Sequence, residues 1–422
     1  MASIPEAKDI PEPVIFPNPE GADITTPEGR AKLIEYYDKN LVENVMRFWL
    51  KYGPDRENGG FFSAIGRDGE LLDDDKSVWF QGRAGWMFAT LYNTVERRPE
   101  WLAVAQSCVK FIDEHCCDSS DGGHMYFTVT KDGQPLRKRR YAFSESFAAI
   151  AHAAVYGATK EEYHARKAKE YFDLYMKWTF EPGVAPPKFT DVRPLIGMSP
   201  RIITIATAQE LRAYLPAEYE ASLTESIDHA IDEIQRLFVK PELKAVMECV
   251  TPDGGISNHF DGRLLNPGHA IEGAWFIMFE GKARGEKGNE LVKLGINMLD
   301  WMFERGWDKE MGGILYFRDV YGKPVQEYWQ DMKFWWPHNE VTIATTLAYQ
   351  LTGDKKYAEW HKMCHDYCDE HFMDKKYGDA FGYLHRDGTV SVDLKGNMWK
   401  GPFHYPRMLW ICSKFLKEMN SK

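Results

Sequence analysis

Twelve segments of this chain carry apolar residues at helical spacing, and the connections between them alternate between short and long. The predicted helices lie over 28–52, 78–97, 100–116, 140–157, 159–179, 200–215, 217–238, 267–283, 286–305, 337–352, 354–371 and 403–419. Short links follow the even-numbered helices, as at 97–99 and 353–354, and long stretches follow the odd-numbered ones. Successive helices of such an array run in opposite directions, so we expect all long connections to meet at one end.

The long connections resemble one another. They read GGFFSAIGRDG (59–69), GGHMYFTVTKDG (122–133), GGILYFRDVYG (312–322) and FGYLHRDG (381–388), with a weaker copy in CVTPDGG (249–255). Alternating aromatics beside a glycine turn predict a β-hairpin in each, and only the third connection lacks this pattern. Self-similarity at a period of about 60–75 residues indicates a repeat architecture.

The repeats predict an all-α protein, an (α/α)6 barrel made of six helical hairpins with β-hairpin loops at one end. An open superhelical solenoid is the alternative, but solenoid repeats are usually shorter and lack hairpin loops. We expect one catalytic domain over 28–422, preceded by a proline-rich extended arm over 1–27.

The composition excludes some partners. The formal net charge is −11 at pH 7, which argues against nucleic acid and against anionic membranes. No apolar run approaches the length of a membrane span, and the N-terminus does not look like a secretory signal. The seven cysteines are irregularly spaced, as in reduced intracellular proteins, so we expect a cytoplasmic location.

Polar side chains suited to catalysis gather just inside the starts of the even-numbered helices. They are Arg83, Glu145, His269, Glu272, His338, Glu340, His404 and Arg407. In a barrel these helix starts surround one mouth. Helix N-termini stabilise anions and lower the pKa of nearby histidines, which suits neutral histidine bases and a developing oxyanion.

Epimerisation beside a carbonyl requires a base on one face of the carbon and an acid on the other. His269 and His404 come from different repeats, and we predict that they are this pair, with Arg83 polarising the carbonyl. Glu272 and Glu340 are predicted to support the histidines and the substrate. Glu145, His338, Trp336 and Arg407 are predicted substrate contacts, although helix caps, core packing and structural ion pairs explain such residues equally well.

A metal site is not expected. His361, Cys364, His365 and Cys368 share one helical face at metal-like spacing, but a single helix rarely presents more than two or three ligands to one ion. GKARGEKG (281–288) follows a helix rather than a strand, so it is not a phosphate-binding loop.

Several motifs resemble the N-acylglucosamine 2-epimerase family, also called the renin-binding protein family. They include DDDKSVWFQGR (73–83), NPGHAIEGAWF (266–276), KFWWPHNE (333–340) and KGPFHYPR (400–407), in the family's order. The resemblance implies an (α/α)6 barrel that interconverts N-acetylglucosamine and N-acetylmannosamine through ring opening and an enediolate, without a required cofactor.

The resemblance also implies functional positions at Arg83, His269, Glu340 and His404. It implies ATP as an effector rather than a substrate, and a homodimer. Trp399 is a further predicted substrate contact, at a position where the cellobiose-epimerising branch also carries Trp. An aldose–ketose isomerase, an (α/α)6 glycosidase with two catalytic carboxylates, and a non-catalytic binding protein are the alternative functions.

Overall fold

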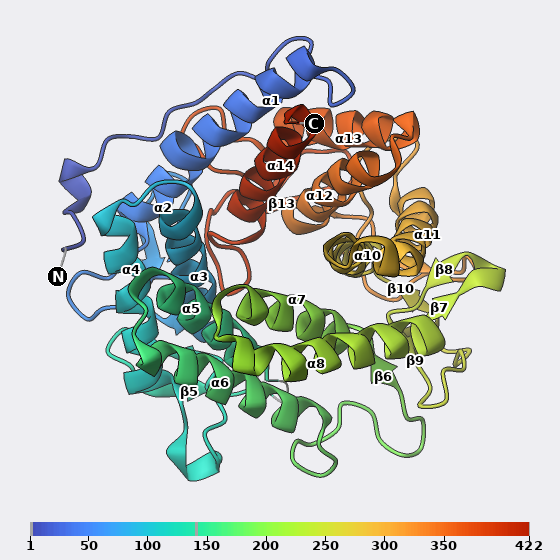
Figure 1. Cartoon of the computed structure of the whole chain (residues 1–422), viewed down its shortest axis with the longest axis horizontal. Coiled ribbons are helices and arrows are strands. Elements are labelled where there is room, and N and C mark those ends of the chain that lie inside the picture. Colours follow the sequence, from blue (N-terminus) through green and yellow to red (C-terminus); the bar gives the residue numbers. More distant parts are fainter. Residues whose placement is uncertain (1–2, 140–141, 422) are drawn as a thin grey trace.

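The computed structural model describes residues 3–139 and 142–421, and Figure 1 shows them as a ring of helices around a central axis. The outer helices are α1 (Pro27–Lys39) with α2 (Met46–Tyr52), α4 (Pro99–Phe111), α6 (Glu162–Phe180), α8 (Glu220–Glu233), α11 (Asn289–Gly306) and α13 (Lys355–Tyr367). The inner helices are α3 (Val78–Thr94), α5 (Phe143–Thr159), α7 (Ser199–Tyr214), α10 (Pro267–Ala283), α12 (Trp335–Thr352) and α14 (His404–Asn420). A single turn, α9 (Phe260–Arg263), precedes α10.

The twelve predicted helical segments are therefore confirmed within the described residues. Several outer segments continue through a wider, π-type turn, as at Asn40–Val45 between α1 and α2 and at Ile112–Cys116 after α4. The helix predicted over 140–157 begins at Phe143, and residues 140–141 lie outside the described part of the chain. α12 starts at Trp335, two residues before the predicted start, because Pro337 is accepted within the first turn of a helix.

Inner and outer helices bury different fractions of their surface. Every residue of α12 from Trp335 to Ala348 is buried. α11 instead buries one stripe, which includes Leu294, Met298 and Met302 at i, i+4 and i+8. A helix buried all round belongs inside a protein, and an amphipathic helix belongs at its surface, so the pattern separates the two rings.

The barrel is closed. α14 packs against α1, which brings the last helical hairpin onto the first. Trp86 on α3 contacts Phe403 and Trp410 at ring-centroid distances of 5.2 and 6.2 Å. The open solenoid is therefore excluded.

Short strands fill the connections at the mouth, where the inner helices begin. They are β1 (Ala64–Ile65), β2 (Leu71–Asp73), β3 (Lys76–Ser77), β4 (Thr128–Val129), β5 (Pro135–Arg137), β6 (Ile196–Gly197), β7 (Val239–Lys240), β8 (Ala245–Val246), β9 (Cys249–Val250), β10 (Leu264–Leu265), β11 (Arg318–Asp319), β12 (Lys333–Phe334), β13 (Tyr383–Leu384) and β14 (Val390–Val392). The predicted hairpins at 59–69, 122–133 and 381–388 are parts of the pairs β1–β2, β4–β5 and β13–β14.

Two hairpin predictions are wrong, because strands also pair between connections. The stretch 312–322 supplies only β11, which pairs with β10 of the preceding connection. CVTPDGG supplies β9, which pairs with β6 of the third connection, the one predicted to lack a hairpin. β3 and β4, and likewise β12 and β13, also pair between neighbouring connections. Strand pairs thus tie the first connection to the second, the third to the fourth, the fourth to the fifth and the fifth to the sixth around the mouth.

The first and last connections are also tied together. Ile65 donates its backbone N–H to the Gly396 carbonyl at 3.2 Å, and Gly396 donates to the Ile65 carbonyl at 2.9 Å. Buried lysine–aspartate pairs anchor the same loops, among them Lys76 with Asp55 at 2.7 Å and Lys333 with Asp308 at 3.0 Å.

The arm before α1 lies along the barrel wall. Ile24 is buried, and Asn18 Oδ1 accepts a hydrogen bond from His365 Nε2 on α13 at 2.8 Å. All seven cysteines are unpaired thiols. Among the described residues, no helix combines the length and apolarity that a bilayer crossing requires.

Candidate active site

A cavity of about 960 Å³ occupies the axis of the barrel and opens among the mouth loops. Side chains from all six inner helices line it. The predicted site residues that reach it are Arg83, His269, Glu272, Trp336, Trp399, His404 and Arg407.

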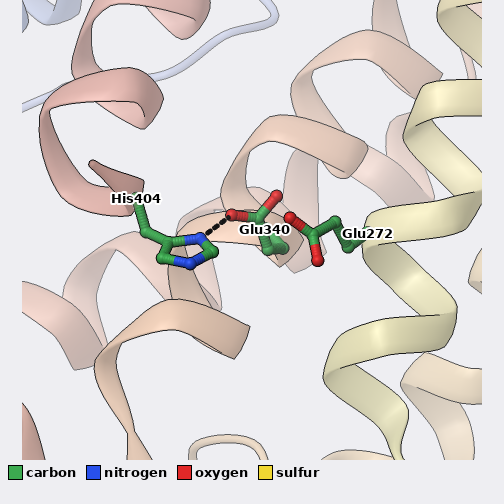
Figure 2. Close-up of side chains that lie close together, drawn as sticks. All are labelled: Glu272, Glu340 and His404. Atoms are coloured by element: carbon green, nitrogen blue, oxygen red, sulfur yellow. Dashed lines mark hydrogen bonds and ion pairs between the residues drawn. The ribbon is translucent and has the colours of Figure 1, made fainter. Parts of the chain in front are cut away.

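His404 is held by a carboxylate behind it. Figure 2 shows His404, Glu340 and Glu272 converging from three inner helices, with His404 Nδ1 2.7 Å from Glu340 Oε1. Glu340 is fully buried and also accepts from Trp275 Nε1 at 2.7 Å. A carboxylate only accepts, so Nδ1 carries the hydrogen and Nε2 is left for the cavity.

Arg407 joins the two carboxylates. Its Nη2 donates to Glu340 Oε1 at 2.5 Å and to Glu272 Oε1 at 2.8 Å. Burial lowers the pKa of Arg407, but the charges of Glu340 and Glu272 raise it overall above its ordinary value. Oxygen and nitrogen atoms of Glu272, Glu340 and His404 lie close enough together to hold a metal ion. Because one guanidinium is bonded to both carboxylates, we interpret the cluster as an ion-pair network.

The environment of His404 favours the neutral imidazole. Burial, followed by the positive charge of Arg407, lowers its pKa well below the ordinary value of 6.5. Arg83 and His269 act in the same direction, and the negative charge of Glu272 opposes them. His404 is therefore suited to accept a proton.

His269 lies at the start of α10, where Asn266 caps the helix by accepting from its backbone N–H at 3.2 Å. Its Nδ1 is 3.0 Å from Glu248 Oε1 and 3.1 Å from Oε2. Burial lowers the pKa of His269, but the charge and hydrogen bond of Glu248, with Glu272 and Glu340, raise it overall above 6.5. The expectation that the helix start lowers the pKa of both histidines is wrong for His269, because a carboxylate beside the ring outweighs the helix dipole.

Trp336 lies between the two histidines. Its ring centroid is 5.0 Å from that of His269 and 5.8 Å from that of His404. Both imidazoles and the indole line the same cavity. A small ligand over Trp336 therefore lies within reach of both.

Arg83 brings a cation into the cavity without a paired carboxylate among the described residues. Its guanidinium stacks on Phe147 and Phe403, 4.3 and 4.8 Å from their centroids, and Nη1 donates to the Trp399 carbonyl at 2.9 Å. Burial lowers the pKa of Arg83 to about 9. The negative charge of Glu272 opposes this shift, and the positive charge of Arg407 adds to it. A desolvated cation of this kind stabilises negative charge that develops on a substrate oxygen.

Comparison with known proteins agrees with this geometry. The family model for N-acylglucosamine 2-epimerase (GlcNAc 2-epimerase) matches residues 60–404, which include every predicted catalytic residue. The chain belongs to the N-acylglucosamine 2-epimerase family.

Relatives in this family, and solved structures with the same fold, match 90% or more of this chain. The N-acylglucosamine 2-epimerase of Bos taurus is 34% identical over 390 residues, 90% of each chain. That of Homo sapiens is 32% identical over 390 residues, again 90% of each chain. Cellobiose 2-epimerase from Bacillus thermoamylovorans B4167 has the same fold, with a TM-score of 0.78, 20% identity and coverage of 92% of this chain and 100% of its own. A D-mannose isomerase structure gives a TM-score of 0.76 at 17% identity, covering 95% and 100%.

Two predicted substrate contacts of this epimerase-family chain do not reach the cavity. Glu145 is fully buried and accepts from the Met125 backbone N–H and His124 Nδ1, both at 2.7 Å. His338 is also fully buried: Nδ1 donates to the Phe334 carbonyl at 2.6 Å, and Nε2 accepts from the Ile314 N–H at 2.8 Å. Both ring nitrogens are used, and burial lowers the pKa of His338 to about 3. Both side chains fix mouth loops by accepting hydrogen bonds from loop backbone N–H groups, as Gln81 does by accepting from the Phe61 N–H at 2.8 Å.

The metal-like set on α13 also has a structural explanation. His361 Nε2 and His365 Nδ1 both lie 3.1 Å from the buried Tyr37 hydroxyl on α1. Burial lowers the pKa of His361 to about 3 and that of His365 to about 4. These residues join the outer helices, away from the cavity.

Sequence reasoning missed Glu248 and Trp275, which hold the catalytic candidates from behind. Trp275 follows Glu272 by three residues on α10, so helical spacing alone could have placed it near the cavity. Glu248 lies in an irregular connection beside β9, where no periodicity indicates direction.

Proposed function

We propose that this protein interconverts N-acetylglucosamine and N-acetylmannosamine by moving the proton on C2 of the ring-opened sugar. The observation that carries the proposal is the pair His269 and His404, each bonded to a glutamate through Nδ1 and both lining one cavity beside Trp336. The substrate is inferred from the names of the relatives, and the proton transfers are inferred from the geometry of the histidine pair.

The reaction begins when one neutral imidazole accepts the C2 proton. The C–H electron pair forms a C1–C2 double bond, and negative charge passes to O1, where Arg83 is the available cation. The other histidine, protonated, then donates to C2 from the opposite face. Because the pKa of His404 is lowered and that of His269 is raised, a proton shared by the pair resides preferentially on His269. This state serves one direction of the reaction, and the opposite state serves the reverse.

The carboxylates of the cavity fit a glycosidase poorly. Glycosidase carboxyl groups flank the bond at about 5–5.5 Å or 6.5–9.5 Å, so that the sugar lies between them. Glu272 and Glu340 instead share one guanidinium nitrogen, and their nearest oxygens lie within 4.8 Å of each other. Arg407, rather than a substrate, occupies the space that they enclose.

The direct test is incubation of the purified protein with N-acetylglucosamine in D2O, followed by proton NMR. We expect N-acetylmannosamine to form, with deuterium entering C2 of both epimers. The doubly substituted His269→Ala/His404→Ala protein is the background control. Accumulation of a ketose would indicate aldose–ketose isomerisation instead, and binding without exchange would indicate a non-catalytic protein.

Further features implied by the family remain proposals. Because side chains carry both proton transfers, we propose that the reaction requires no metal or redox cofactor and survives EDTA. We also propose a cytoplasmic homodimer in which ATP acts as an effector. Sedimentation velocity and assays with and without ATP test the last two points.

A further inference from the structure

Glu248 belongs to none of the helices that carry the predicted catalytic residues. It lies in the connection between α8 and α10, between β8 and β9. Its backbone N–H donates to the Leu264 carbonyl at 3.1 Å, and its carbonyl accepts from the Met198 N–H at 3.0 Å. Met198 directly precedes α7, so the backbone of Glu248 is fixed by two connections at once.

The side chain of Glu248 is directed at His269. Both carboxylate oxygens lie within 3.1 Å of Nδ1, and Oε1 accepts from Ser199 Oγ at 3.3 Å. The carboxylate can only accept, so the ring is held with hydrogen on Nδ1 and with Nε2 left for the cavity. His269 is its only ion-pair partner in the described part of the chain.

The charges that act most strongly on His269 are all negative. Glu272 stands on its own helix and Glu340 on α12, in addition to Glu248. Within residues 3–139 and 142–421, no arginine is bonded to Glu248, in contrast with Glu340, which shares Arg407 with Glu272. The full charge of Glu248 is therefore available to balance a protonated His269.

We propose that Glu248 is a positioning residue for the epimerase activity proposed above. It fixes the Nδ1–H tautomer of His269, turns Nε2 toward the substrate, and balances the charge of the ring when it carries the proton. Nothing in this role brings Glu248 into contact with the sugar, so its loss should lower turnover rather than binding.

The kinetic test compares Glu248→Gln with Glu248→Asp and with Glu225→Gln, a substitution of an exposed glutamate on α8. We expect Glu248→Gln to lose about 10- to 100-fold in kcat, as for other carboxylates that orient a histidine, with KM within about 3-fold. The high-pH limb of kcat/KM should move about one pH unit lower. Glu248→Asp keeps the charge and should retain the pH limb, and Glu225→Gln should behave as wild type.

An NMR titration of His269 tests the proposal without reference to turnover. In wild type, ¹⁵N shifts should report Nδ1–H on the neutral ring, and the titration midpoint should fall in Glu248→Gln. Equal midpoints in the two proteins, or a Glu248→Gln variant with unchanged kcat and pH profile, would overturn the proposal. If the wild type bound the sugar without epimerising it, the NMR result would still decide the coupling, and only the proposed function would fail.

Discussion

On each of two sides of the cavity a histidine is bonded to a glutamate through Nδ1, but the pKa of the histidine is raised on one side and lowered on the other. On the α10 side, His269 keeps 27% of its side chain exposed and faces an unshared carboxylate. On the α14 side, His404 keeps 9% exposed, and Arg407 neutralises the carboxylate behind it. A histidine–glutamate pair therefore does not determine a protonation state; burial and the next charge outward do.

The largest expected effect is the loss of either histidine. His269→Ala and His404→Ala should each lower the conversion rate by about 10²–10⁴-fold while remaining folded. Each should also lose deuterium exchange from one epimer more than from the other, because each serves one face of C2. NMR in D2O measures both quantities.

The matched control is His229→Ala, which removes an exposed histidine from α8. It should keep wild-type rates. Near-normal conversion by His404→Ala would exclude the two-histidine assignment.

The second expected effect is that of Arg407→Gln, which should reduce the difference in pKa between His404 and His269. Arg407→Gln leaves Glu272 and Glu340 buried without their shared cation, and breaking a buried pair costs about 3–5 kcal/mol of unfolding free energy. In protein that folds, the pKa of His404 should rise, so the low-pH limb of kcat/KM should move to higher pH. Chemical denaturation and a pH series measure the two effects, and an unchanged low-pH limb would contradict the role given to Arg407.

The third effect is the pH dependence of the wild type. Activity requires one proton on the histidine pair. It should therefore fall as pH rises through the raised pKa of His269, and fall again as pH drops through the lowered pKa of His404. The slope outside the plateau is about tenfold per pH unit for one group.

Both directions of the reaction should give the same kcat/KM profile, because the two productive states hold the same number of protons. A plateau that excludes pH 6.5, or profiles that differ between the two sugars, would disagree with this pairing.

The smallest expected effect is at His338, outside the cavity. His338→Gln should keep activity within about 3-fold, because Gln81 makes the equivalent backbone bond in the first repeat. Any change should be in stability, by about 1–3 kcal/mol if the Ile314 N–H loses its acceptor. Thermal unfolding together with initial rates separates the two, and a large loss of kcat in fully folded protein would return His338 to the catalytic group.

The sequence was sufficient for the barrel and for the end at which the site lies. Helical periodicity revealed the twelve segments, and the clustering of polar residues at even-numbered helix starts indicated the mouth. The sequence was not sufficient to predict which side chains within one helical turn point into the cavity. Trp336 lines the cavity, but His338 is two residues later, about 200° around the helix, and points away from it.

The same rule explains the other misplaced residue. Phe143 and Phe147 line the cavity, so Glu145 between them faces the loops. Glu248 could not be predicted for a different reason. It reaches His269 only because β6 pairs with β9, a contact between connections that no local pattern announces.

The strand pairing between neighbouring mouth connections has a consequence for evolution and design. A loop that hydrogen-bonds to both neighbours cannot change its backbone conformation alone, because the change would break hydrogen bonds with the neighbouring loops. Examples are the pairing of β3 with β4, the pairing of β10 with β11, and the backbone hydrogen bonds of the first loop with the last at Ile65 and Gly396. New substrate preference in this barrel should therefore arise by exchange of single side chains on a fixed rim. Grafting one loop from a relative should fail where grafting two neighbours together succeeds.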